Sequence, residues 1–300
     1  MLRSLNTGAT GIRQFQTQLD VIANNLANIN TVGFKAGRVD FSDALSQTLR
    51  PPTSDSSNRT GSSSVQLGNG VGVAAIKNSF TQGAVNTTGV PTDLAITGEG
   101  FFIVKNTATS ETFVTRSGDF RVDDSGNLVT NQGLRVQGFN KEIGINENYA
   151  DTETPGDLRM DKGTVPAAAI PAGMTAAEVA AAGVSTVTVD SSGRINITLS
   201  NGITYTRGQV LLQKFNNPQA LLKQGNNLYS GISQAGPLAK PGSAGLGGLG
   251  SIAPGQLEIS NVDISREFTN MITTQRAYQA NARVITASDD LLQETMRIMR

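Results

Sequence analysis

The sequence has no cysteine, no histidine and no tryptophan, and aromatic residues make up only 5% of its 300 residues. Without cysteine and histidine, a chain lacks disulfides, thiolate nucleophiles, imidazole bases and most transition-metal sites. We therefore expect no catalytic residues, no cofactor and no metal. Composition alone leaves open an enzyme that uses only carboxylates, such as a glycosidase, but no pair of acidic residues has a spacing that supports one.

An excess of charge of either sign is also missing, because 24 basic residues are balanced by 24 acidic residues. This balance argues against a nucleic-acid surface and against strong attraction to anionic lipid. No stretch approaches the roughly 20 apolar residues that cross a bilayer, and the first residues lack the apolar core of a cleavable signal peptide. We expect a protein that spans no membrane and that would be exported with its N-terminus intact.

What the sequence does contain is an apolar heptad pattern near each end, within residues 1–50 and 256–300. Steps of three and four residues alternate, as in the seam of a coiled coil. The front seam comprises Leu2, Leu5, Ala9, Ile12, Gln16, Leu19, Ala23 and Leu26. The rear seam comprises Ile264, Phe268, Met271, Gln275, Tyr278, Ala282, Ile285, Asp289, Leu292, Met296 and Met299. We predict terminal helices that pair as a coiled-coil domain, although ordinary amphipathic helices packed on their own domain would show a related pattern.

Both helices have predicted boundaries. Ser260 provides an N-cap for the rear helix and Asp263 a second acceptor near its start. Gly33 is expected to stop the front helix and to let Phe34 turn back onto it. The helical segments are therefore delimited by the sequence as well as by their periodicity.

Between the helices, short apolar runs alternate with glycine-containing turns, which predicts an all-β region. The expected strands are 71–76, 94–96, 101–104, 113–115, 120–122, 128–130, 134–137, 186–189, 195–199, 203–205 and 209–215. Asn201-Gly202 is a strong hairpin signal between two of them. The predicted fold class is α+β, with a β-rich core and its connectors at 51–140 and 186–235.

Three segments differ in composition from this core. Residues 50–64 are rich in Pro, Ser, Asn and Thr, which indicates an extended or mobile connector. Residues 141–185 are interrupted by Pro155, Pro166, Pro171 and Gly173 and include an alanine-rich run at 175–182, so we predict a small exposed insertion with one short helix. Residues 236–255 are dominated by Gly, Pro, Ala and Ser and are predicted to be a linker.

Candidate ligand sites in the sequence are weak. The oxygen-rich segments 122–128 and 189–195 do not have the spacing of a twelve-residue calcium loop, so hairpin turns explain them better. Gly98-Glu99-Gly100 lacks the third glycine and the helix of a dinucleotide fingerprint. Asp289 and Asp290 point about 100° apart on a helix and cannot easily flank one substrate bond.

Two separated motifs carry a resemblance to a known family. The segment 23–35, ANNLANINTVGFK, resembles the N-terminal signature of the bacterial flagellar rod and hook proteins, and residues 260–281 are similar to the C-terminal signature. Core elements such as 68–71, 80–83, 93–96, 98–102 and 115–120 also resemble the family, which leaves only 141–185 outside the likeness. Agreement of two distant motifs is far more specific than either motif alone.

The resemblance implies an axial homopolymer, either distal rod or compact hook, that transmits torque for motility. In it the terminal helices would form an inner wall around an export channel, with the β-rich domain as the next shell. It further implies contacts with neighbouring rod, hook or junction proteins, export through the flagellar type III apparatus, and a periplasmic or extracellular location. The segment 47–51 and the small insertion resemble distal-rod proteins, whereas 136–140 and 215–218 have hook counterparts.

From the seams and the two motifs we predict which residues form the assembly interface. The asparagines are included because buried amides both donate and accept hydrogen bonds and can satisfy neighbouring subunits. The predicted residues are Leu5, Ile12, Leu19, Asn24, Asn25, Leu26, Asn28, Gly33, Phe34, Asn261, Phe268, Met271, Gln275, Arg276, Tyr278, Asn281, Ile285 and Leu292. A secreted adhesin or a phage-tail-like fibre with coiled-coil ends is the alternative from another class.

Overall fold

The structure, a computed structural model, describes residues 2–52, 63–144, 149, 154–166, 169–170, 179, 181–237 and 241–298. The chain forms two compact units. The first unit contains Met1–Ile29, Ala36–Ser79 and Val262–Arg300, and the second contains Asn30–Lys35 and Phe80–Asn261. The chain therefore passes between the units four times.

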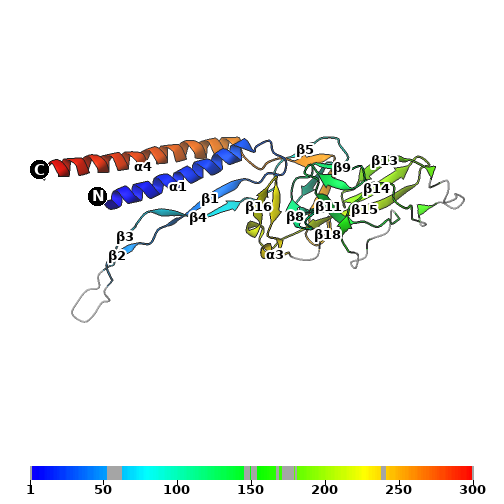
Figure 1. Cartoon of the computed structure of the whole chain (residues 1–300), viewed down its shortest axis with the longest axis horizontal. Coiled ribbons are helices and arrows are strands. Elements are labelled where there is room, and N and C mark those ends of the chain that lie inside the picture. Colours follow the sequence, from blue (N-terminus) through cyan, green and yellow to red (C-terminus); the bar gives the residue numbers. More distant parts are fainter. Residues whose placement is uncertain are drawn as a thin grey trace. The chain divides into compact units, whose positions relative to one another are not determined.

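Two long helices dominate the first unit: α1, Leu2–Ala27, and α4, Ile264–Ile298 (Figure 1). At 1.5 Å per residue they are about 39 Å and about 52 Å long. The N-cap of α4 is Asp263 rather than the predicted Ser260, since Asp263 Oδ1 accepts hydrogen bonds from the backbone N–H groups of Ser265 at 2.9 Å and Arg266 at 3.2 Å. Side-chain oxygens one residue before a helix satisfy its first free N–H groups in this way.

An antiparallel β-ribbon packs beside α1 in the same unit (Figure 1). Phe41 of the ribbon makes an edge-on contact with Phe15 of α1, with ring centroids 6.1 Å apart. The ribbon strands are β1 (Gly37–Asp43), β2 (Gln47–Arg50), β3 (Val65–Leu67) and β4 (Val71–Asn78), paired β1 with β4 and β2 with β3. The sequence predicted only the last of these strands, because the others carry polar and exposed residues without a regular apolar alternation.

The second unit is built from antiparallel strands. Its main sheet has the order β13-β14-β15-β11-β7-β8-β17-β16, with β9, β10, β12 and β18 attached at its sides. The strand bounds are β5 (Val85–Thr87), β6 (Leu94–Thr97), β7 (Phe101–Lys105), β8 (Thr112–Thr115), β9 (Phe120–Val122), β10 (Leu128–Thr130), β11 (Arg135–Phe139), β12 (Gly156–Asp157), β13 (Val184–Val189), β14 (Arg194–Leu199), β15 (Thr204–Gln213), β16 (Leu222–Gly225), β17 (Leu228–Ser230), β18 (Gly242–Ser243), β19 (Ser251–Pro254) and β20 (Gln256–Glu258). A short helix, α3 (Ile232–Ala235), follows β17.

β15 is the central strand of this unit, and almost every residue in it is buried. The sequence predicted two strands here, at 203–205 and 209–215, but the structure has one continuous strand that pairs with β14, β11, β7 and β18. The predicted hairpin at Asn201-Gly202 joins β14 to β15, with Gly202 at φ +83° as such turns require. The predicted α+β class with a terminal helix at each side of a β-rich region is confirmed.

Two segments that the sequence assigned outside the core pack into it. Leu158 and Met160, in the predicted exposed insertion, belong to the main hydrophobic cluster, and so do Ala244 and Ile252 from the predicted linker. β19 pairs with β6 along its full length. Short apolar residues separated by Gly and Pro lack periodicity, so the sequence could not distinguish these packed segments from loops. Most of the alanine-rich helix predicted at 175–182 and most of the 50–64 connector lie outside the described residues.

Candidate assembly interface

Two glycines of α1 lie in its contact with α4 and allow the two helices to pack closely. Gly8 and Gly11 of α1 face Ile285 and Asn281 of α4. A Cβ atom on Gly11 would lie 2.8 Å from Asn281 Nδ2, and one on Gly8 would lie 3.1 Å from Ile285 Cγ1. The two missing side chains therefore let the helices approach each other to a distance that larger residues would prevent.

The shielded face of α4 keeps a heptad spacing, but its register differs from that of the predicted seam. It comprises Glu267, Met271, Thr274, Tyr278, Asn281, Ile285, Ser288, Leu292 and Thr295. Thr274 and Ser288 are the most buried, and their hydroxyls donate to backbone oxygens one turn earlier at 2.7 Å and 2.8 Å. This internal hydrogen bonding allows small polar residues to pack against a glycine-containing helix. Met271, Tyr278, Ile285 and Leu292 of the predicted seam lie on this face, whereas Ile264, Phe268, Gln275, Asp289 and Met296 are exposed.

Large apolar side chains remain exposed on other faces of α4. The exposed fractions of these residues range from 44% for Val284 to 77% for Ile298. The set is Ile264, Phe268, Ile272, Val284, Leu291, Met296 and Ile298. Val284, Leu291 and Ile298 are each seven residues apart, so they form one stripe along the second half of the helix.

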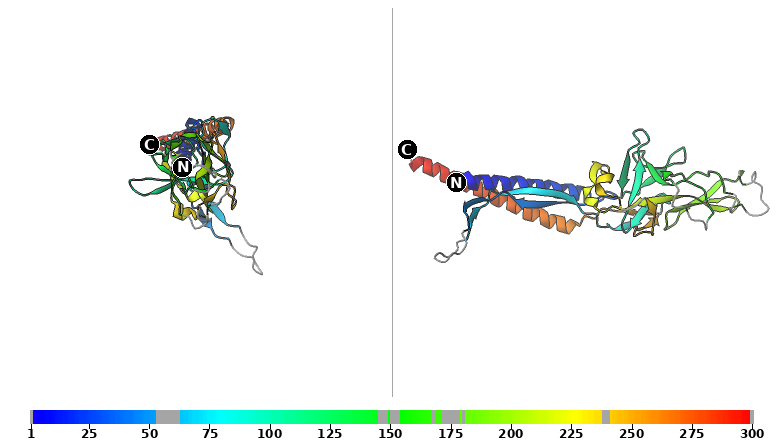
Figure 2. Two further views of the ribbon diagram at one scale, coloured as in Figure 1. Left: turned by 90° about the vertical axis from the view of Figure 1, so that its right-hand side faces the viewer. Right: turned by 90° about the horizontal axis from the view of Figure 1, so that it is seen from below.

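α4 also continues past the start of α1 (Figure 2). Ser4 Oγ lies 3.3 Å from Ser288 Oγ, which sets the antiparallel register at this end of the pair. Residues after about 290 consequently have no α1 residue opposite them in the described structure. This overhang, residues 291–298, is about 12 Å long and carries Leu291, Met296 and Ile298.

The remaining predicted positions on the helices divide into shielded and exposed sets. Leu5, Ile12, Leu19 and Leu26 of α1 are half-buried. Asn24 of α1 and Gln275 and Arg276 of α4 are exposed. The predicted set therefore marks several faces of the helix pair and does not form one continuous seam.

Two of the clustered asparagines make hydrogen bonds within the chain, whereas the sequence predicted that they bond to neighbouring subunits. Asn25 is buried, and its side-chain amide makes two hydrogen bonds to Gly37: Oδ1 accepts from the Gly37 N–H at 2.9 Å, and Nδ2 donates to the Gly37 oxygen at 2.8 Å. Asn28 Nδ2 donates to the backbone oxygen of Asn24 at 2.9 Å. Asn25 thus fixes the first residue of β1 to α1, with both the nitrogen and the oxygen of its amide engaged in that contact.

Gly33, Phe34 and Asn261 lie in the second unit. α1 ends at Ala27, six residues before Gly33, so Gly33 does not cap that helix. It has φ +68°, and a Cβ atom there would lie 2.5 Å from the backbone nitrogen of Ser117, so both conformation and space require glycine. Phe34 is 2% exposed and packs under Lys223 Nζ, which lies 4.0 Å from the centre of its ring.

A buried charged cluster that the sequence analysis did not identify lies next to these residues. Glu258 is fully buried, with Oε1 2.6 Å from Lys35 Nζ and Oε2 3.3 Å from Arg116 Nη1. Lys35 is also fully buried. Burial lowers the pKa of the Lys35 ammonium and that of the Arg116 guanidinium, although Glu258 opposes this by favouring the charged forms. Lys35 ends the first motif and Glu258 precedes the second, but nothing in the local sequence indicates that they meet.

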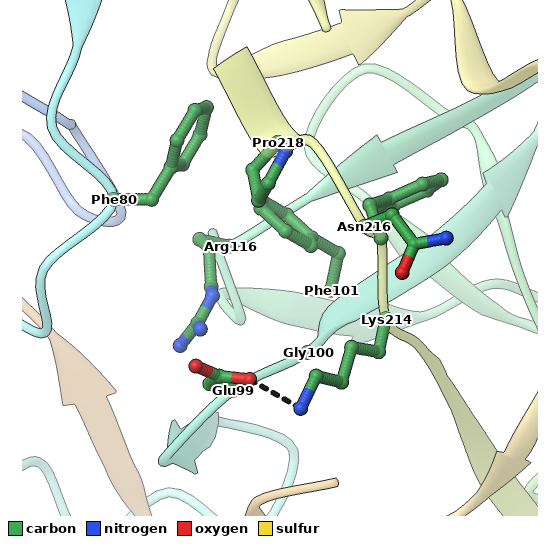
Figure 3. A pocket seen from close by; sticks show the side chains of 9 residues that line it. Phe80, Glu99, Gly100, Phe101, Arg116, Lys214, Asn216 and Pro218 are labelled. Atoms are coloured by element: carbon green, nitrogen blue, oxygen red, sulfur yellow. Dashed lines mark ion pairs between the residues drawn. The ribbon is translucent and has the colours of Figure 1, made fainter. Parts of the chain in front are cut away.

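A pocket of about 260 Å³ in the second unit adjoins this cluster (Figure 3). It is lined by three phenylalanines, Pro218, Arg116 and the ion pair of Glu99 with Lys214, whose Oε2 and Nζ atoms are 2.5 Å apart. The three phenylalanines are Phe80, Phe101 and Phe215. Among the described residues that line the pocket, Glu99 is the only carboxylate and is paired with Lys214, so these residues offer no acid–base pair of carboxylates.

The weak ligand motifs of the sequence form turns in the structure. The Gly126 N–H donates to the Asp123 oxygen at 2.7 Å, and the Gly193 N–H donates to the Asp190 oxygen at 2.8 Å, each glycine having a positive φ. In the described parts of the chain, no three acidic side chains are grouped so as to hold a metal ion. No helix in those parts is long and apolar enough to cross a membrane.

Comparison with known proteins identifies the chain. Three family models match it in order: "Flagella basal body rod protein" at residues 5–35, "Flagellar hook protein FlgE/F/G D1 domain" at 95–197, and "Flagellar basal body rod FlgEFG protein C-terminal" at 253–298. The flagellar basal-body rod protein FlgG of Bacillus subtilis is 36% identical over 300 residues, covering 100% of both chains. The chain belongs to the flagellar rod and hook protein family.

Other members of the flagellar rod and hook family align over the same span. FlgG of Caulobacter vibrioides is 33% identical over 302 residues, covering 99% of both chains. The flagellar hook protein FlgE of Borreliella burgdorferi is 28% identical over 443 aligned positions, which cover 99% of this chain and 100% of that protein. As a member of this family, the protein is a structural axial component of the flagellum.

Proposed function

We propose that this protein is a rod subunit, of the distal rod rather than the hook, and that it acts as a non-enzymatic building block. The supporting observation is length: the Bacillus subtilis rod protein aligns over 300 positions with both chains fully covered, whereas the Borreliella burgdorferi hook protein needs 443 positions. The extra positions of the hook alignment have no counterpart in this chain. The length of the chain therefore matches that of a rod subunit and leaves no room for the additional positions of the hook protein.

Polymerisation of the rod would use the apolar surface that one copy leaves uncovered. Val284, Leu291 and Ile298 form a stripe with heptad spacing, and their exposed fractions range from 44% to 77%. Leu291 and Ile298 lie on the overhang of α4. A heptad stripe of this kind is covered by a second helix in a coiled coil. We infer that helices of neighbouring copies cover it, so that the coiled coil expected from the sequence forms between copies as well as within one. In this proposal the contact is heterologous, and a heterologous contact generates an open helical polymer when its rotation does not close into a ring.

The polar positions on the same helices are consistent with a water-filled channel. Asn24, Gln275 and Arg276 are exposed and carry amide or guanidinium groups that water can solvate. In the proposed rod these residues face an export channel. Neighbouring rod, hook and junction proteins would contact the ends of the polymer, and the subunits would reach it through the flagellar export apparatus.

The proposal is tested by placing a charge on the exposed stripe. Leu291→Asp should leave the isolated subunit folded, because Leu291 is 58% exposed in one copy. It should prevent polymer formation, because an unpaired carboxylate in a dry helix contact costs several kcal/mol at every subunit. Gln293→Asp is the matched control, since Gln293 is an exposed polar residue on the same overhang.

The measurements are sedimentation and electron microscopy of the purified variants, and swimming of a strain whose own copy is deleted. The expected result is a soluble Leu291→Asp subunit with no filaments and no swimming, beside a Gln293→Asp variant that behaves like the parent. If Leu291→Asp forms normal filaments and restores swimming, the stripe is not the polymer contact.

A further inference from the structure

Glu258 lies three residues before the last passage of the chain between the two units, and it is hydrogen-bonded to the second-unit segments at the other passages. Within the second unit, the Glu258 backbone oxygen accepts a hydrogen bond from the Gly33 N–H at 2.8 Å. Its Oε1 atom accepts from Lys35 Nζ at 2.6 Å and from the Gly83 N–H at 2.8 Å. These partners come from residues 30–35 and 80–83, which continue into α1, β1 and β4 of the first unit.

Two further contacts tie the same three segments together. Lys35 Nζ also donates to the backbone oxygen of Thr81 at 2.8 Å. Asn261, the last residue before α4's unit begins, donates through Nδ2 to the oxygen of Thr81 at 3.1 Å and to its Oγ1 at 2.9 Å. The three second-unit segments at the passages, 30–35, 80–83 and 256–261, are thus hydrogen-bonded to one another. We call Lys35, Thr81, Gly83, Glu258 and Asn261 the clasp.

The clasp is anchored to the sheet rather than to the passages alone. Arg116 follows β8, lies within 3.3 Å of Glu258 and donates through Nη2 to the Gly98 oxygen at 2.8 Å. β20, which carries Glu258, pairs with β5 from Gln256↔Thr87 to Glu258↔Val85. Lys35 and Glu258 are fully buried, so their ion pair is shielded from water and from salt.

We propose that the clasp is a load-bearing joint of the chain. Force applied through α1, the ribbon or α4 enters the second unit at a passage, and there the clasp distributes it over all three segments. Without it, the segments at Gly83 and Asn261 would transmit the force to one short strand pair, β20 with β5, which separates one hydrogen bond at a time. The proposal concerns the chain by itself and goes beyond its place in a rod.

The test pulls on the two passages directly. Asn24 and Arg266 are exposed positions on α1 and α4 close to the passages, and the chain has no cysteine of its own. Asn24→Cys with Arg266→Cys therefore provides two unique handles for single-molecule force spectroscopy. The pull should first separate α1 from α4, which pack against each other. The second unit of the parent should then open in one high-force step, whereas that of Glu258→Gln should lose the step and open gradually at lower force.

A control variant separates load bearing from stability. Asp161→Asn breaks an ion pair of Arg207, another buried arginine of the second unit, whose Nη2 lies 3.0 Å from Asp161 Oδ1. Asp161 is remote from the passages in sequence and bonds to none of the clasp residues. The Asp161→Asn variant should have a lower melting temperature than the parent but should still show the high-force step. An equal loss of the step in both variants, or its survival in Glu258→Gln, would overturn the proposal.

A measurement on the unaltered protein covers the case in which Glu258→Gln does not fold. The amides of Gly33 and Gly83 should exchange their hydrogens only when the whole second unit opens, because the clasp holds both donors. Their exchange should slow in step with that of β15 amides as denaturant is withdrawn. Fast exchange of the two amides through local opening would show that the clasp carries no load.

Discussion

Replacement of Leu158 by alanine should strongly destabilise the second unit, although Leu158 lies in a segment that the sequence describes as an exposed insertion. The side chain is fully buried in the main hydrophobic cluster. Its Cδ1 atom occupies the space above Gly138 and Gly208, at 2.8 Å and 2.9 Å from where their Cβ atoms would be. Buried leucine-to-alanine changes cost about 2.7–5 kcal/mol, and more when the cavity cannot collapse.

The magnitude should lie in the upper half of that range. Gly138 is in β11 and Gly208 in β15, and these strands are hydrogen-bonded to each other, so neither backbone can move into the cavity. A loss of about 4 kcal/mol corresponds to a fall in melting temperature of roughly 8–16 °C for a unit of this size. Differential scanning calorimetry of the purified chain measures this fall directly.

Thr154→Ala is the matched control, because Thr154 is exposed in the same segment. It should change the melting temperature by less than about 2 °C. If Leu158→Ala also shifts the transition by no more than this, the segment is dispensable and the packing argument fails. Replacement of all of 141–185 by a Gly/Ser linker, which the sequence predicts to be tolerated, should instead unfold the second unit.

Two further predictions concern the helix pair and the tyrosines. Gly11→Leu should force α1 away from Asn281 and abolish the cooperative melting of the first unit, while the melting of the second unit is unchanged; circular dichroism at a helix band against a strand band separates the two. Burial raises the pKa of Tyr205 and of Tyr229 to about 12. The folded state therefore holds these protons more tightly than the unfolded state, so their contribution to stability is complete below pH about 10 and is lost as pH rises towards about 12. Absorbance titration of phenolate should show two late protons, one of which disappears in Tyr229→Phe; normal ionisation of all four tyrosines near pH 10 would contradict this.

The spacing of apolar residues in the sequence was sufficient to predict the elements in which that spacing is regular. The heptads near both ends, the apolar strands from β6 to β11 and the Asn201-Gly202 hairpin were predictable because a helix or a half-buried strand imposes a regular spacing on its apolar residues. The missing cysteine and histidine likewise excluded whole classes of chemistry before any coordinates were known. The two terminal motifs together indicated the family.

Tertiary structure alone decided which partners these elements have. Heptad spacing fits more than one register, and the register within the chain is the one that places Ile285 and Asn281 against Gly8 and Gly11. In that register Thr274 and Ser288 are the most buried residues of α4. The remaining apolar stripe of α4 was therefore left exposed. The ion pair of Lys35 with Glu258 joins residues 223 positions apart. A contact of that kind depends on how the chain folds back on itself, and no local pattern of residues specifies it.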